Sequence, residues 1–189
     1  VAKTLQKVGP IKFGALAVMA VLATIVMAGL KFSKQLDEIG KKFGAIGVQE
    51  FGGQLVAADA QMARLGFKTG DAAIAAEELA DNFGVGFEQA IKMSGSVADM
   101  SKMLGMGVKE GAALMGTLTE IGGLSEESAL QLASATDQLA TANGVAPGAV
   151  MKDISKSTKS FARFMKDGGK NVAKAAIMAK KLGADLGTI

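Results

Sequence analysis

The sequence contains no histidine and no cysteine among its 189 residues. Without histidine, the chain lacks the commonest general base, the commonest metal ligand and every catalytic triad built on imidazole. Without cysteine, a disulfide framework and any thiolate site are excluded. A metal site made only of carboxylates needs a cluster of them in one loop, and the sequence has no such loop. We therefore expect a protein that is not an enzyme and that binds no cofactor or metal.

Tryptophan and tyrosine are also absent, and the nine phenylalanines are the only aromatic residues. The hydrophobic residues, 49% of the chain, are therefore mostly alanine, leucine, methionine, valine and isoleucine. Small side chains bury little apolar area each, so a compact core would be thin, but they let helices approach closely. Alternation with a period of two residues never lasts, so strand signals are almost absent. The composition predicts an all-α protein.

The net charge is only +3, but the charges are unevenly distributed along the chain. Residues 1–42 contain seven basic and two acidic residues, residues 43–151 contain five basic and thirteen acidic, and residues 152–181 contain nine basic and two acidic. Blocks of this kind are usually solvated helix faces. The sharper interpretation is that the basic ends contact lipid phosphate or, without sequence specificity, DNA.

One segment, residues 13–30, has no charged residue and lies between Lys12 and Lys31. Eighteen helical residues span roughly 27 Å, close to the hydrocarbon thickness of a bilayer. We predict a transmembrane helix flanked by the two lysines, with a buried core helix and a signal peptide as alternatives. Both flanks are basic, so the orientation is not predicted. The large apolar residues expected to insert are Phe13, Leu16, Val18, Met19, Val21, Leu22, Ile25, Val26, Met27 and Leu30.

An internal repeat is the clearest signal in the remainder of the chain. Two sets of glycines recur with one 39-residue period: Gly66, Gly105, Gly144 and Gly183, and, between them, Gly84 and Gly123. A glycine just after the last helical residue adopts the left-handed conformation that ends a helix. We therefore predict helical hairpins that repeat with this period and turn at these six glycines.

Several residues near the turns match the preferences of helix ends. Asp71, Glu110 and the pair Glu126–Glu127 would lie in first turns, where a negative charge is favourable. Ser125 is a predicted N-cap and Pro147 suits a first helical position. Four G-x-x-x-G spacings occur near these helix starts, and we interpret them as turns rather than as helix-pairing sites: Gly66/Gly70, Gly107/Gly111, Gly144/Gly148 and Gly183/Gly187.

These patterns divide the chain into a basic lead segment (1–12), the hydrophobic helix (13–30), an amphipathic helical connector (31–65) and the helical repeats (66–189). The fourth unit is unfinished, so we expect the repeats to continue in a longer protein. The predicted fold is an all-α, elongated array of helical hairpins with one N-terminal hydrophobic helix. We also expect an oligomer, because an apolar stripe of eighteen residues is too large to leave in water.

The segment ANGVAPGAVMKDISKSTKSFARFMKDGGKNVAKAAIMAKKLGADLGTI, residues 142–189, resembles part of the tail tape measure proteins of tailed bacteriophages. The resemblance lies in the order of NGVAPGAV, FARF, DGGKN and AAIMAKKLG. The upstream GLSEESALQL and GVGFEQAIKM resemble the preceding units, so the resemblance covers roughly residues 66–189. It implies a non-enzymatic virion protein that lies in several copies in the tail lumen, among tail tube and baseplate proteins.

The same resemblance implies that the protein sets tail length during assembly and leaves the tail ahead of the genome. Hydrophobic segments of this family are thought to enter the host inner membrane and help DNA to cross it. Residues 13–30 would then be covered by partner helices in the virion and released into lipid on infection.

Other classes of protein remain open on the sequence alone. A membrane-anchored helical pore former or toxin-like protein would share the apolar helices without needing a 39-residue array. A soluble α-solenoid binding module would bury residues 13–30 as a core helix. An enzyme is the least favoured class, because no nucleophile–base pair can be assembled. KDGGKN, residues 166–171, lacks the earlier glycine and the preceding strand of a phosphate-binding loop.

Overall fold

The computed structural model describes residues 33–34, 37, 41, 48–157 and 169–188. The chain divides into two units, Val1–Val48 and Gln49–Ile189. In the first unit, the described residues 33–34, 37, 41 and 48 are all helical. The hydrophobic run Phe13–Leu30, with Lys12 and Lys31, lies outside the described residues.

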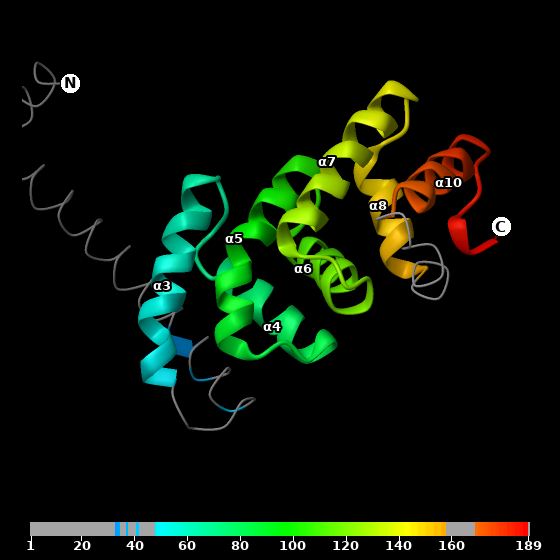
Figure 1. The fold of residues 1–189 in the computed structure, drawn as a ribbon. Coiled ribbons are helices and arrows are strands. Elements are labelled where there is room, and N and C mark those ends of the chain that lie inside the picture. Colours follow the sequence, from blue (N-terminus) through cyan, green and yellow to red (C-terminus); the bar gives the residue numbers. More distant parts are fainter. Residues whose placement is uncertain (1–32, 35–36, 38–40, 42–47, 158–168, 189) are drawn as a thin grey trace, which may run out of the picture. The chain divides into compact units, whose positions relative to one another are not determined.

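The second unit is built from helices, and the described part of the chain contains no strand. This confirms the predicted all-α class for these residues (Figure 1). Besides the α-helices there are a π-helical turn, η1, and a 3₁₀ turn, η3. In chain order the elements are α3 (Val48–Arg64), α4 (Asp71–Phe83), α5 (Phe87–Leu104), α6 (Val108–Gly116), η1 (Thr117–Ile121), α7 (Glu126–Ala142), α8 (Pro147–Lys156), α10 (Lys170–Lys181) and η3 (Leu186–Thr188).

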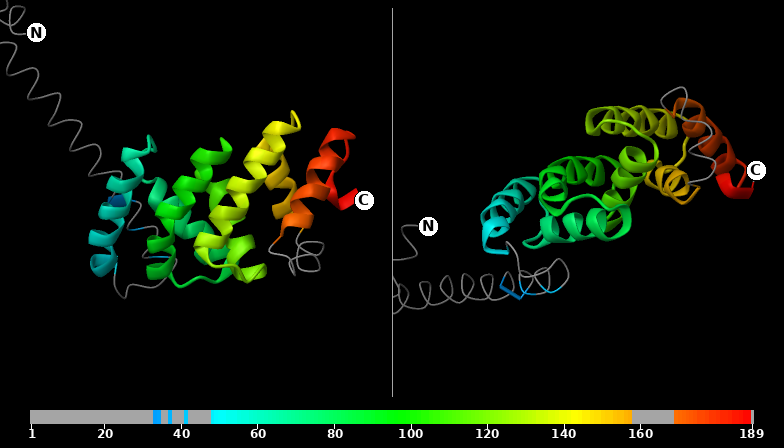
Figure 2. Two further views of the ribbon diagram at one scale, coloured as in Figure 1. Left: turned by 45° about the horizontal axis from the view of Figure 1, so that its top comes forward. Right: turned by 60° about the horizontal axis from the view of Figure 1, so that its bottom comes forward.

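The helices of the second unit recur in pairs with the 39-residue period. Helices α3, α5 and α7 begin at residues 48, 87 and 126, and α10 ends one period after the end of α7. Each of α3, α5 and α7 is followed by a second helix. The first helices pack on one another, α5 on α7 and α7 on α10, and the second helices do the same, α4 on α6 and α6 on α8. Figure 2 shows the first helices side by side.

Burial of side chains follows the same period. One register position of the first helices is fully buried in all four units, although its residue changes from unit to unit: Met62, Ser101, Ala140 and Ala179. Another buried set, in the second helices, consists of Ala76, Met115 and Ile154. Because interiors are close-packed, such differences in volume at one position must be compensated by the size of the neighbouring side chains or by the spacing of the helices.

We interpreted the four G-x-x-x-G spacings as turns. For the second glycine of two of these spacings, Gly111 and Gly148, this interpretation is wrong. Gly111 and Gly148 lie inside α6 and α8, against a neighbouring helix. A Cβ at Gly111 would collide with the Ser101 hydroxyl of α5, and a Cβ at Gly148 would lie 2.6 Å from the carbonyl oxygen of Leu104. These glycines permit close helix contact, which is the role that the spacing has in helix pairing.

Candidate functional site

The turn that follows each first helix has the same hydrogen bond in all four units. The backbone N–H of Phe67 donates to the carbonyl oxygen of Met62 at 3.2 Å. The same bond recurs with the 39-residue period, at N···O distances of 2.9 Å, in the pairs Met106–Ser101, Val145–Ala140 and Ala184–Ala179. The residue before each donor has a φ angle between +62° and +94°, and it is Gly66, Gly105, Gly144 or Gly183. A side chain is strained in this conformation, so each turn requires glycine.

The turn that follows the second helix also recurs. Gly84 and Gly123 have φ angles of +70° and +68°. The N–H of Val85 donates to the carbonyl of Leu79 at 3.4 Å, and one period later Leu124 donates to Leu118 at 3.1 Å. The third position of this set falls at residue 162, outside the described residues.

The helix starts agree with three predictions from the sequence. The Ser125 side chain accepts a hydrogen bond from the Ser128 N–H at 3.2 Å, which confirms it as the N-cap of α7. Pro147 is the first residue of α8, as expected. The Glu110 carboxylate, in the first turn of α6, accepts a bond from the Gly107 N–H at 3.1 Å. These contacts satisfy N–H groups that a helix leaves unpaired at its start.

Asp59 has a structural role that the sequence did not predict. It is buried in α3, and its two oxygens accept hydrogen bonds from the N–H groups of Gly70 and Ala72, at 2.9 and 3.0 Å. The start of α4 has no side-chain cap of its own, because Gly70 occupies the N-cap position. Asp59 therefore caps α4 from the preceding helix. A single aspartate within an alanine-rich helix was the only available signal, and it did not reveal the partner.

Asp153 is a second buried carboxylate that the sequence did not reveal. It lies in α8 at the register position that Ala75 and Leu114 occupy in the earlier units, and both of those are buried. Its carboxylate accepts a hydrogen bond from the Leu186 N–H at 2.6 Å and lies 3.7 Å from the Lys180 ammonium. Asp153 thereby connects α8 to both α10 and η3.

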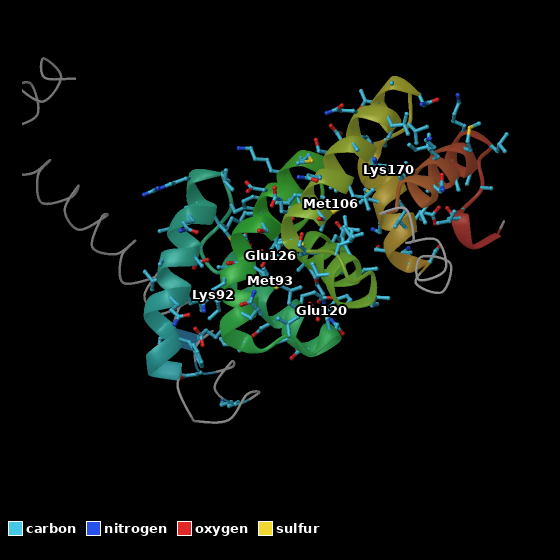
Figure 3. The ribbon with its side chains drawn as sticks, viewed as in Figure 1. Lys92, Met93, Met106, Glu120, Glu126 and Lys170 are labelled. Carbon is cyan, nitrogen blue, oxygen red and sulfur yellow. The ribbon has the colours of Figure 1, made fainter. Side chains whose placement is uncertain are left out.

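Helices α3 and α5 meet through an aromatic contact. One period later, α5 and α7 meet through polar contacts. Phe87, the first residue of α5, meets Phe51 of α3 edge to face, with ring centroids 5.7 Å apart. One period after Phe87 stands Glu126, whose carboxylate accepts bonds from Ser96 at 2.8 Å and Gln89 at 3.4 Å (Figure 3). Successive units therefore share their geometry but not their chemistry.

Two grooves between helices of the second unit are lined by described residues. The larger, about 400 Å³, lies between α7 and α10 and is lined by apolar side chains such as Leu132 and Leu139, with Lys170 and Lys174 also on its wall. The smaller, about 330 Å³, lies among Phe83, α6, η1 and α8. In η1 the hydroxyls of Thr117 and Thr119 donate to the carbonyl oxygens four residues earlier. Such hydrogen bonds slightly destabilise a helix and often bend it.

An ion pair borders the smaller groove. The Lys152 ammonium lies 2.6 Å from the Glu110 carboxylate and joins α8 to α6. The hydrogen bond from Lys152, together with that from the Gly107 N–H, lowers the pKa of Glu110. A second pair joins Lys180 and Asp185, and their hydrogen bond raises the pKa of Lys180 and lowers that of Asp185.

The polar contacts described above mainly join helices to one another. No group of three acidic side chains that could hold a metal ion occurs among the described residues. Each buried carboxylate, Asp59 and Asp153, is engaged by backbone N–H groups. The arrangement is suited to holding successive helix pairs in a fixed register.

The predicted membrane residues could not be placed, since Phe13–Leu30 falls outside the described part of the chain. Among the residues that are described, no helix has the length and apolar character needed to span a bilayer. Comparison of the chain with protein-family models, curated proteins and solved structures gives no significant match.

Proposed function

We propose that this chain is a segment of a tail tape measure protein of a tailed bacteriophage, lying in the tail lumen as a ruler of tail length. The observation that carries the proposal is the same hydrogen-bonded glycine turn, present in four successive units with the 39-residue period. The ordered motifs of residues 66–189 support the assignment to this class. Its partners would be further copies of the chain and the tail tube and baseplate proteins.

A periodic helical protein is physically suited to act as a ruler. Each unit adds the same number of residues and therefore the same increment of length. One period adds roughly 58 Å as one continuous helix, but only about 8–10 Å when a helix pair stacks side by side on its neighbour. In both arrangements, contacts within one polypeptide determine the increment of length.

Deletion of one whole unit from the gene in the phage tests the ruler. Removal of residues 87–125 should shorten the tails by one increment, measured by electron microscopy of purified virions. A step of roughly 58 Å would mean that the units lie end to end, and a step of about 10 Å that they remain stacked. Unchanged tail length, or absence of the protein from virions, would contradict the proposal. As a control, Ile74→Asp changes an exposed side chain and should leave tail length unaltered.

The proposal includes a second role, in which residues 13–30 enter the host inner membrane and assist genome ejection. Each charge at the centre of a membrane helix costs roughly 2.5–3.5 kcal/mol. Changing Met19 and Val26 together to Asp should therefore oppose insertion by on the order of 5 kcal/mol. Lys12 and Lys31 would lie at the two headgroup layers.

The double variant separates this role from that of a buried core helix. Tails should assemble at normal length, while liposome binding and genome delivery are both lost. Failure of the protein to fold or assemble without any membrane would indicate a core helix instead. Normal delivery together with lost liposome binding would show that the membrane role is wrong.

The stacked pairs also favour a second candidate, an α-solenoid module that binds a partner. In such modules each helix pair contacts its neighbours and the stack presents an extended surface. The groove between α7 and α10 would be part of that surface. Detection of the protein in purified virions favours the ruler, and its absence there together with capture of a partner by this groove favours the module.

A further inference from the structure

Asn143 is the point at which the turn after the first helix departs from the repeat. It comes directly before Gly144, one of the turn glycines, and neither of the other two asparagines in the chain precedes a glycine. Asparagine is a thermolabile residue, and a following glycine has no side chain to obstruct its backbone nitrogen. In the other three units the corresponding residue is leucine: Leu65, Leu104 and Leu182.

The side-chain amide of Asn143 joins the end of α7 to α10. Its Nδ2 donates to the carbonyl oxygen of Leu139 at 2.8 Å, and its Oδ1 accepts from the Lys181 ammonium at 3.3 Å. The backbone N–H of Gly144 donates to the carbonyl oxygen of Thr141 at 3.0 Å. Both the side-chain amide and the nearest backbone nitrogen that could attack it are therefore held by hydrogen bonds.

We propose that Asn143 is a site of deamidation, in which the Gly144 nitrogen displaces the nitrogen of the side-chain amide. The Gly144 nitrogen gives its proton to water and bonds to Cγ of Asn143, and a five-membered succinimide ring forms. The Cγ–Nδ2 bond breaks, and Nδ2 takes a proton from water and leaves as ammonia. Water then opens the ring at one of its two carbonyl carbons. The product is aspartate, or isoaspartate, in which the main chain continues through Cγ.

The folded turn slows this reaction, so that local opening at the end of α7 controls its rate. Ring closure requires Cβ of Asn143 to be eclipsed with the Gly144 nitrogen. At the observed ψ of 5°, the backbone nitrogen of Asn143 is eclipsed with it instead, and Cβ is turned away. Rotation about ψ moves the Gly144 N–H away from the Thr141 carbonyl. Helix ends open locally at low free-energy cost, so the native chain should react slowly rather than not at all.

The two products change the end of α7 differently. Aspartate keeps the path of the backbone and places a carboxylate beside the Lys181 ammonium. Isoaspartate adds one methylene to the backbone within the turn. It therefore displaces the Val145 N–H from the Ala140 carbonyl oxygen, which it contacts at 2.9 Å in the turn that all four units share. The modification is a slow, irreversible change at one junction of the stack, and it stands independently of the proposed tail function.

Incubation of the purified full chain in mildly alkaline buffer, with and without guanidinium chloride, tests the site. Peptide mass spectrometry should show Asn143 converted to the acid in both samples, about 10-fold more slowly without denaturant. Asn82 and Asn171 are controls within the same molecule, because each precedes a larger residue, and they should remain amides. An unmodified Asn143 in the native sample, or equal conversion at all three asparagines, would overturn the site. Equal rates with and without denaturant would overturn the control by local opening.

Two variants test the effect on the turn. Incubation should lower the Tm of the native chain by about 2–4 °C, in proportion to its isoaspartate content. Asn143→Leu carries the residue of the other units and cannot form the ring, so its Tm should not change on incubation. Freshly purified Asn143→Asp carries the charge without the added methylene and should match the fresh native chain. An unchanged Tm of the incubated native chain, or an equal loss in Asn143→Leu, would contradict the proposed effect.

Discussion

At the scale of single residues, the buried aspartates show how a small apolar core tolerates charge. Burial of an unpaired carboxylate is costly, and hydrogen bonds from backbone N–H groups offset that cost. Asp59 receives two such bonds, and in return it satisfies the unpaired start of α4. Its role is therefore a property of the contact between two helices and not of the helix that carries it.

We expect Asp59→Ala to destabilise the second unit by about 1.5–3 kcal/mol, because it leaves the N–H groups of Gly70 and Ala72 without their acceptor. Urea unfolding measures the loss as a change in the free energy of unfolding. Asp137 occupies the same register position in α7, so Asp137→Ala is the matched control and should change stability by less than about 0.5 kcal/mol. Similar losses for the two variants would argue against a capping role for Asp59.

At the scale of secondary-structure elements, glycines serve two different purposes. Gly105 ends a helix through its positive φ angle, whereas Gly111 lies within a helix and lacks the Cβ that would collide with Ser101. The first purpose depends on a few neighbouring residues, the second on the distance between α5 and α6. The ion pair of Glu110 with Lys152 then connects α6 to the next second helix, α8.

Gly111→Ala should therefore destabilise the protein by about 1–3 kcal/mol, the usual cost of overpacking. Gly95→Ala is the matched change in α5, where the nearest atom to the added Cβ lies 3.8 Å away. Alanine is the better helix former, so this control should raise stability by about 0.5–1 kcal/mol. Thermal unfolding followed by circular dichroism distinguishes the two. Stabilisation by both changes would mean that α5 and α6 are not closely packed.

The Glu110–Lys152 pair should stabilise the folded state only above acidic pH. The pKa of Glu110 is lowered in the folded state, so the contribution is complete above the unfolded value of about 4.3 and disappears as the pH falls through the folded value. Both side chains are about half exposed, so we expect less than about 1 kcal/mol. The difference in Tm between the native chain and Glu110→Gln should be constant above about pH 5.5 and shrink as the pH falls below the unfolded pKa of about 4.3.

Lys152→Met provides the control for this pH dependence. In that background the effect of Glu110→Gln should largely disappear at every pH, because Lys152 is the main cause of the lowered pKa. A difference that persists at low pH, or that grows as the pH falls, would assign the stabilisation to something other than this pair.

At the scale of the whole molecule, the second unit is a periodic stack of helix pairs. Each helix pair contacts its neighbours, so stability should be a sum of terms within pairs and between adjacent pairs. Apolar side chains are exposed on α3 and α10, Val56 on the first and Met178 on the second.

Deletion of residues 87–125 removes one complete period and should leave a chain that still folds. In the shortened chain, α7 follows α4 at the same sequence separation as α5 does in the native chain. The purified protein should keep its helical circular dichroism and a single cooperative unfolding transition, at lower stability. The smaller deletion of residues 87–115 breaks the period and should abolish cooperative unfolding. If the smaller deletion destabilises the protein less than the larger deletion does, the periodic description is wrong.

The sequence by itself determined the all-α class and the 39-residue period, for a local physical reason. Helix formation, the N-cap at Ser125, the start at Pro147 and the φ angle of a turn glycine depend on residues within a few positions along the chain. The tertiary structure alone decided that Gly111 and Gly148 pack against neighbouring helices, and that Asp59 and Asp153 accept bonds from later segments. Those roles depend on how closely helices approach in space, because atoms from distant positions in the chain supply the contacts.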